Sequence, residues 1–205
     1  MTRFKRTGLL VALGLAAIMI LLIGTGFVRD IVLGPQMSHV RSTGKALIGG
    51  AFNLTAHTGK RMTDKDFRGK YMLVYFGYTF CPDICPAELQ VMSAALDALG
   101  KTAEKIAPIF ITVDPERDDV KQMAQYMAHF HKSFVGLTGT VQEIKDAAKK
   151  YRVYFAKVKD KSSTAEYLMD HSSIIYLMDG KGEYVTHFTY GTSPDKIAER
   201  IAKIL

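Results

Sequence analysis

The chain of 205 residues has only two cysteines, Cys81 and Cys85, and this scarcity argues against two kinds of site. A closed four-ligand zinc site would need two further ligands, and no second cysteine pair exists to provide them. A structural disulfide is also a poor interpretation, because a loop of about five residues constrains the unfolded chain very little. Reactive or metal-binding thiols explain the pair better.

Internal repeats, low-complexity segments and dense basic runs are also lacking. The net charge is +7, but it falls to +4 when residues 1–30 are left out. That value is ordinary for a globular domain, and the basic residues are scattered without interleaved aromatics. A nucleic-acid partner therefore has little support.

The N-terminal segment over residues 8–28 carries no charged residue. At about 1.5 Å per residue it is just long enough to cross the bilayer core as one transmembrane helix. A cleaved secretory signal is the competing interpretation, but no convincing cleavage site follows Ile23, and no Arg- and Ser-rich mitochondrial transit sequence precedes the segment. The basic residues before this segment predict that residues 1–7 lie in the cytoplasm. The segment would then anchor the chain in the bacterial inner membrane, with the C-terminal part in the periplasm.

Residues 29–45 contain glycine, proline and serine with little periodicity, which predicts a linker before one domain over residues 46–205. In that domain, apolar runs typical of strands alternate with segments of helical periodicity. This order predicts an α/β fold with a central sheet flanked by helices on both faces. We expect strands over residues 71–77, 109–113, 134–137, 153–158, 173–178 and 184–190, helices over residues 87–99 and 120–131, a helix capped by Thr140, and a final helix opened by Ser193 and Pro194.

Cys81 and Cys85 lie where the strand predicted over residues 71–77 gives way to a helix. Ligand sites of open α/β sheets lie outside the carboxyl ends of the strands. Because a helix N-terminus favours the thiolate, we expect a lowered pKa for Cys85, with Cys81 in the preceding loop. Helical residues four apart lie about 6 Å apart, so the pair can close a disulfide or hold one ion. The spacing leaves redox and metal chemistry equally open.

The third ligand of a metal site is expected to be a histidine. A thiolate pair suits soft ions, Cu(I) first, and leaves a trigonal site one ligand short. His171 stands out because it ends a polar loop directly before a predicted strand, and such a loop can bring a ligand to the cysteines. The other histidines have ordinary structural explanations: His39, His57, His129, His131 and His187.

Three segments together closely resemble the Sco/SenC family of membrane-anchored copper proteins. They are residues 75–86 (YFGYTFCPDICP), residues 113–118 (VDPERD) and residues 170–172 (DHS). The resemblance runs from about Gly49 to Leu205 with the motifs in order. It implies a thioredoxin-like fold and a copper site with Cys81, Cys85 and His171 as ligands, for Cu(I) and in addition Cu(II).

The resemblance also implies a role in maturing the dinuclear copper centre of cytochrome c oxidase subunit II. We predict a metallochaperone that takes copper from an upstream donor and passes it to that subunit. The alternative is a thiol-disulfide oxidoreductase, in which one cysteine attacks a partner's disulfide and the other resolves it. His171 would then be dispensable, and whether the protein is an enzyme stays open.

Three further residues have both a functional and a structural interpretation. Asp83 matches the family pattern and either tunes the thiols, faces a partner or caps the helix. Asp114 either borders the site or belongs to a plain Asp-Pro turn. Met169 is close enough to His171 in sequence to be an occasional extra copper ligand. Most other methionines lie in the anchor or at core spacing in helices, such as Met19, Met92, Met123 and Met127.

Overall fold

The computed structural model describes residues 13–21, 47–159 and 166–205. The chain divides into two compact units, Met1–Lys45 and Ala46–Leu205. In the first unit, residues 13–21 form a helix; the rest of the predicted anchor and the predicted linker lie outside the described residues. Among the described residues, no helix has the length and apolar character needed to cross a membrane.

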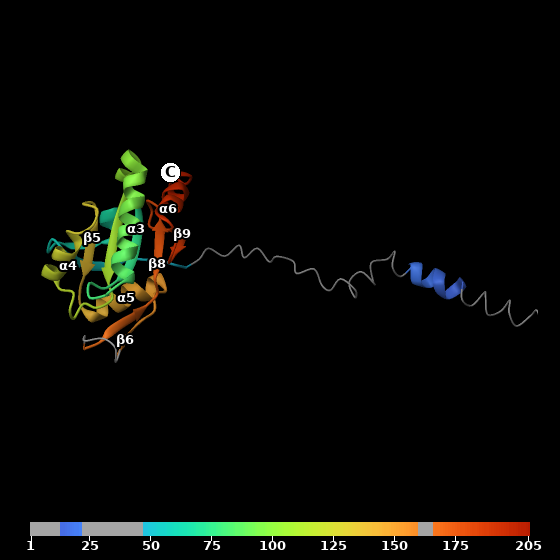
Figure 1. The fold of residues 1–205 in the computed structure, drawn as a ribbon, viewed down its shortest axis with the longest axis horizontal. Coiled ribbons are helices and arrows are strands. Elements are labelled where there is room, and N and C mark those ends of the chain that lie inside the picture. The colour runs from blue at the N-terminus through green and yellow to red at the C-terminus, as the bar shows by residue number, and fades with distance from the viewer. Residues whose placement is uncertain (1–12, 22–46, 160–165) are drawn as a thin grey trace, which may run out of the picture. The chain divides into compact units, whose positions relative to one another are not determined.

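The second unit is built on a seven-stranded mixed sheet in the order β2-β1-β5-β4-β3-β8-β9 (Figure 1). In its centre, β3 (Tyr71–Gly77) pairs in parallel with β4 (Ile106–Thr112), and β4 pairs in parallel with β5 (Val135–Thr138). The central strands are continuous apolar runs because they are buried on both faces. The antiparallel strands at the two sides are β1 (Asn53–Ala56), β2 (Arg61–Thr63), β8 (Ile174–Met178) and β9 (Tyr184–Thr189).

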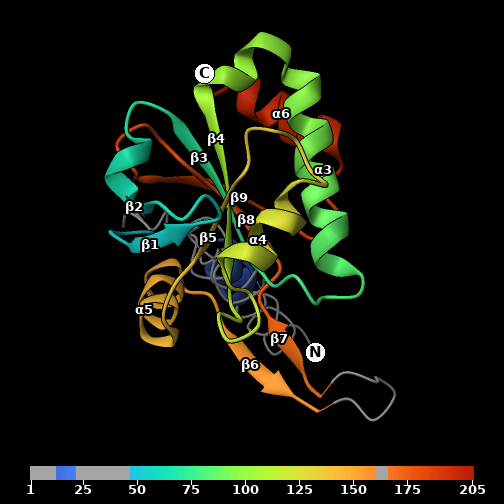
Figure 2. The same cartoon turned by 90° about the vertical axis from the view of Figure 1, so that its left-hand side faces the viewer.

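Helices cover both faces of the sheet (Figure 2). Tyr75 and Phe76 follow one another in β3, so their side chains point to opposite faces. Tyr75 contacts Cys85 of α3, whereas Phe76 packs on Tyr151 of α5 with ring centroids 5.3 Å apart. The helices are α3 (Ile84–Leu99), α4 (Val120–Met127), α5 (Val141–Tyr151) and α6 (Pro194–Ala202), with 3-10 turns η1 (Asp64–Phe67) and η2 (Gly100–Lys105).

A second, two-stranded antiparallel sheet consists of β6 (Phe155–Val158) and β7 (Leu168–His171). Figure 2 shows this hairpin below the large sheet, on the side where the parallel strands end. Its strands are joined through residues 160–165, which lie outside the described part of the chain. The hairpin matters for function because β7 ends at His171.

The predicted α/β class, with a central sheet and flanking helices, is confirmed. The strand over Tyr71–Gly77 is found as predicted, and Thr140 caps α5 by accepting the amide of Glu143 at 3.2 Å. The helix predicted over residues 120–131 ends at Met127, because the chain tightens there into i+3 hydrogen bonds such as Phe130 to Met127. The prediction omitted β1, β2 and β7; His171 is therefore the end of a strand and not of a loop.

Candidate metal centre

Cys81 and Cys85 lie on the turn that leads from the carboxyl end of β3 into α3. The amide of Cys81 donates to the carbonyl oxygen of Tyr78 at 3.3 Å, and the amide of Cys85 donates to Sγ of Cys81 at 3.4 Å. Both thiols are free; Cys85 is fully buried and Cys81 is half-buried. The pair therefore presents one covered and one accessible sulfur.

His171 lies against this pair from the opposite hairpin. Its Nε2 is 3.3 Å from Sγ of Cys85, and its Nδ1 is 3.1 Å from the carbonyl oxygen of Ser172. Because a carbonyl only accepts, Nδ1 carries the proton of the neutral ring, and the Nε2 lone pair is left for a ligand. A tautomer held in this way is typical of metal-ligating histidines. Tyr75 and Tyr78 flank the imidazole edge-on.

The three predicted ligands thus meet at one place, although 86 positions separate Cys85 from His171. Among the described residues, no group of three or more His, Cys, Asp or Glu side chains could hold a metal ion as it stands. With bonds of about 2.3 Å to sulfur and 2.0 Å to nitrogen, a trigonal ion needs those ligands about 3.7 Å apart. The 3.3 Å contact must therefore widen by about 0.4 Å, a small side-chain adjustment.

The pKa is lowered at Cys81 and raised at Cys85, whereas the prediction was a lowered pKa for Cys85. The hydrogen bond from the Cys85 thiol lowers the pKa of Cys81 to about 3, with help from the amides of Cys85 and Asp83. The same bond, together with burial and the charge of Cys81, raises the pKa of Cys85. The expected low pKa of Cys85 is therefore wrong, because its sulfur is buried while the first amides of α3 face Cys81.

A cavity of about 370 Å³ opens beside Cys81 and His171. The cysteine turn forms one wall, and the β6–β7 hairpin forms the other. Apolar side chains make up much of its lining, among them Ile84, Val158 and Leu168. An incoming group can therefore reach Cys81 from this cavity while Cys85 stays covered.

The structure also shows where the three further candidate residues, Asp83, Asp114 and Met169, lie. Asp83 occupies the N-cap position of α3, but its side chain makes no capping hydrogen bond, so the helix-cap interpretation is wrong. Asp114 is buried and accepts from Nε of Arg117 at 2.5 Å and from the hydroxyl of Tyr167 at 3.0 Å. Met169 is buried and lines the cavity beside His171, and its role as an extra ligand stays a prediction.

Three of the other histidines have structural partners. Nδ1 of His57 accepts the amide of Gly136 at 3.0 Å, and His131 hydrogen-bonds Ser133 at 2.7 Å. His187 hydrogen-bonds the neighbouring Tyr184, and His39 lies outside the described residues. The predicted core methionines are confirmed as buried: Met92, Met123 and Met127.

Two residues at the site escaped the sequence reasoning. A Cβ on Gly77 would lie 2.8 Å from Sγ of Cys85, so the sulfur packs on the bare Cα of this glycine. A glycine inside an apolar strand signals such a close approach and could have been found. The hydroxyl of Tyr75 lies 3.9 Å from the same sulfur, and burial raises the pKa of this phenol. No local pattern distinguishes Tyr75 from the other tyrosines.

The fold and the site define an α/β protein of thioredoxin-like architecture with a histidine beside a reactive cysteine pair. The SCO1/SenC family model matches residues 40–205, and the chain belongs to this family. Protein sco1 of Schizosaccharomyces pombe is 46% identical over 173 residues, which cover 83% of this chain and 66% of that protein. The chain spans about half to two thirds of the length of the first curated relatives it matches.

Solved structures of relatives share the fold, and several hold copper. Arabidopsis thaliana ScoI with copper bound is 42% identical with a TM-score of 0.72, covering 76% of this chain and 96% of that one. Bradyrhizobium japonicum ScoI with copper bound is 44% identical with a TM-score of 0.71, covering 77% and 99%. BsSco, described as a member of the Sco family of cytochrome c oxidase assembly proteins, is 25% identical with a TM-score of 0.59, covering 78% and 95%.

In the reduced protein, iodoacetamide is expected to modify Cys81 well before Cys85. Cys81 borders the cavity and has a lowered pKa, whereas Cys85 is buried and has a raised one. An ordinary thiol with a pKa of about 8.5 loses about tenfold in rate per pH unit below that value. Cys81 stays a thiolate from pH 8 to pH 5, so its rate should change little over this range. Tandem mass spectrometry locates the label, and a tenfold fall per pH unit would contradict the assignment.

Proposed function

We propose that the chain is a membrane-anchored copper metallochaperone. It binds Cu(I), and also Cu(II), through the sulfurs of Cys81 and Cys85 and Nε2 of His171. It delivers copper for maturation of the dinuclear copper site of cytochrome c oxidase subunit II. The observation that carries the proposal is the 3.3 Å approach of His171 to Cys85, which adds an imidazole to the thiol pair. Copper in two relatives and the description of BsSco support it.

The two sulfurs have different parts in copper transfer. Two thiolates and one neutral imidazole around Cu(I) leave one net negative charge, and soft thiolates prefer this ion. Binding requires Cys85 to lose its proton, because its raised pKa keeps the thiol protonated in the free protein. Cys81 is the accessible ligand, so an acceptor thiolate enters from the cavity and displaces Cys81 first. Buried Cys85 releases the ion last.

The location belongs to the same proposal. Residues 8–28 anchor the chain in the bacterial inner membrane, and residues 1–7 lie in the cytoplasm. Residues 29–45 link the anchor to the copper-binding domain over residues 46–205 in the periplasm. The uncharged segment and the basic residues before it support this orientation. An upstream copper donor and the oxidase subunit would meet the domain on that side.

The lowered pKa of Cys81 and the raised pKa of Cys85 favour thiol-disulfide reductase activity as a second candidate function. The Cys81 thiolate would attack a disulfide of the oxidase subunit, forming a mixed disulfide and releasing one partner thiolate. Cys85 would give its proton to the released partner thiolate and attack Sγ of Cys81, which releases the second partner thiolate. The partner disulfide is reduced by two electrons, the cysteine pair becomes a disulfide, and a dithiol reductant must restore it.

Replacing His171 by alanine separates the two candidates. We expect His171→Ala to lower the Cu(I) affinity of the reduced full chain by more than tenfold. The contribution of a nitrogen ligand to the X-ray absorption spectrum at the copper edge should also disappear. The reduction potential of the cysteine pair should stay within about 30 mV, which corresponds to a tenfold change in the thiol-disulfide equilibrium. His131→Ala is the matched control, because His131 bonds Ser133 away from the cysteines.

Each outcome has a defined meaning. Unchanged copper affinity and spectrum in His171→Ala would show that the three-ligand site is wrong. If the variant also still matured the oxidase in cells, thiol reduction would become the better account. Loss of both copper affinity and maturation, with the potential retained, supports the chaperone.

A further inference from the structure

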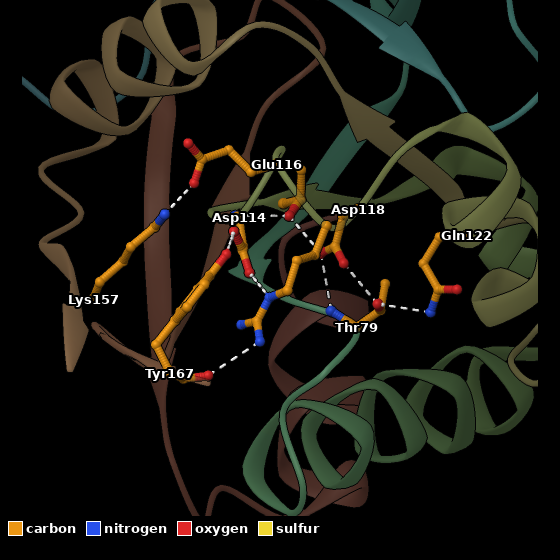
Figure 3. Close-up of polar contacts among 9 residues, drawn as sticks. Thr79, Asp114, Glu116, Asp118, Gln122, Lys157 and Tyr167 are labelled. Atoms are coloured by element: carbon orange, nitrogen blue, oxygen red, sulfur yellow. Dashed lines mark hydrogen bonds and ion pairs between the residues drawn. The ribbon is translucent and has the colours of Figure 1, made fainter. Parts of the chain in front are cut away.

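The loop between β4 and α4, residues 113–119, contacts both halves of the site (Figure 3). On the cysteine side, Asp118 is fully buried and its carboxylate accepts three hydrogen bonds. Two come from the amide and the hydroxyl of Thr79, at 2.9 and 2.6 Å. The third comes from the hydroxyl of Thr112 at the end of β4, at 2.6 Å. Thr79 stands two residues before Cys81, so Asp118 ties the cysteine turn to the large sheet.

On the histidine side, Arg117 holds the segment that enters β7. Its Nη1 donates to the carbonyl oxygen of Tyr167 at 3.0 Å, and its guanidinium lies 3.8 Å from the centre of that ring. The Tyr167 hydroxyl donates to Asp114, which also accepts from Nε of Arg117. The ion pair of Glu116 with Lys157 ties β6 to the same loop.

Arg117 also touches the cysteine turn. Its guanidinium lies 4.8 Å from the ring centre of Phe80, the residue directly before Cys81. Nη2 is buried and has no hydrogen-bond partner among the described residues, so aromatic rings and the Asp114 carboxylate compensate its charge. The cation therefore lies between Phe80 of the cysteine turn and Tyr167 of the histidine hairpin.

These contacts matter because they bridge the two halves of the site. β6 and β7 form a sheet of their own, and the hairpin joins the large sheet through β8, which begins three residues after His171 and pairs with β3. The position of His171 over the cysteines is then set by this ladder together with the side chains that bridge the hairpin and the turn. We propose that Arg117 and Asp118 are positioning residues, an inference that rests on the proposed copper site. Arg117 holds the His171 hairpin in place over the cysteines, and Asp118 holds the cysteine turn in place.

The two roles predict different dependence on His171. Arg117 acts through the spacing of the halves, which matters only while His171 is a ligand. Arg117→Met should therefore lower the Cu(I) affinity of the full chain about tenfold in the wild-type background and less than twofold in the His171→Ala background. Asp118 acts through the cysteines, so Asp118→Asn should lower the affinity about tenfold in both backgrounds.

Matched controls come from an ion pair at the amino end of β3. Asp64 is buried like Asp118, and it accepts from Nη2 of Arg68 at 2.5 Å. Arg68→Met and Asp64→Asn should leave Cu(I) affinity within twofold while removing comparable polar contacts. If Arg117→Met fails to fold, Arg117→Lys replaces it, because lysine keeps a charge for Asp114 but lacks the planar fork that also reaches Tyr167.

Competition with a colorimetric chelator measures Cu(I) affinity. X-ray absorption spectroscopy at the copper edge measures the contribution of a nitrogen ligand. Arg117→Met should weaken the nitrogen signal, and Asp118→Asn should retain it. Equal effects of Arg117→Met in both backgrounds, or effects no larger than those of the controls, would overturn the positioning roles alone. Equal binding by wild type and His171→Ala would instead overturn the three-ligand site, and with it the role of Arg117.

Discussion

Cys85→Ser is expected to lower the Cu(I) affinity of the reduced chain by more than the 10–100-fold that loss of a supporting residue usually costs. Cys85 is the buried sulfur of the site and the one in contact with His171. A serine oxygen is a hard ligand that Cu(I) disfavours, and only Cys81 and His171 would remain to hold the ion. Competition with a colorimetric Cu(I) chelator measures the loss.

The control for this variant is Ala95→Ser, which also places a hydroxyl on the buried face of α3. It should change Cu(I) affinity by less than twofold. An affinity of Cys85→Ser within tenfold of wild type would show that Cys85 is not a ligand. The same variant also tests the reductase candidate, because a protein without the resolving sulfur should accumulate a mixed disulfide between Cys81 and its partner.

Gly77→Ala is expected to damage the site without touching any ligand. The new Cβ would lie 2.8 Å from Sγ of Cys85 and 2.9 Å from the ring of Phe110. Both neighbours are fully buried, so neither can move aside freely. Overpacking of this kind destabilises by about 1–3 kcal/mol. Displacement of the sulfur should also lower Cu(I) affinity at least tenfold, about 1.4 kcal/mol of binding free energy.

Gly136→Ala separates the two effects, because Gly136 is a buried strand glycine paired with Phe110 on the neighbouring strand. Its Cβ would lie 2.7 Å from Cγ of Met127 and 3.0 Å from Cε of Met123, with no cysteine among its nearest contacts. Denaturant unfolding should show a similar loss of stability in both variants, and only Gly77→Ala should lose copper affinity. Equal copper affinities would mean that Gly77 serves packing alone.

The contrast between the sulfurs bears on how the site works. A covered thiol next to an imidazole and an accessible thiolate beside a cavity give copper or a partner disulfide one direction of approach. The first bond to form or break is then at Cys81 in both candidate functions. The functions differ in whether His171 must act as a ligand, which is why that residue decides between them.

Much of the fold could be predicted because its signals are local. The unbroken apolar run of β3 indicates a strand buried on both faces, and Thr140 with Glu143 forms a capping box within four residues. Short strands were missed where pairing, and not composition, makes the strand. β7 consists of Leu-Met-Asp-His, a sequence without β-branched residues, and it is a strand because it pairs with β6.

The sequence by itself determined that the only two cysteines stand at a strand-to-helix junction, because strand and helix signals are set by residues within a few positions. The motifs further singled out His171. Only the tertiary structure decided that Cys85 is covered, that Cys81 has the lowered pKa, and that His171 reaches Cys85. The burial of Cys85 and its contact with His171 depend on packing across 86 positions, and the pKa of Cys81 depends on the hydrogen bond from the Cys85 thiol; no local pattern encodes them. For the same reason, the structure alone places Arg117 and Asp118 between the two halves of the site.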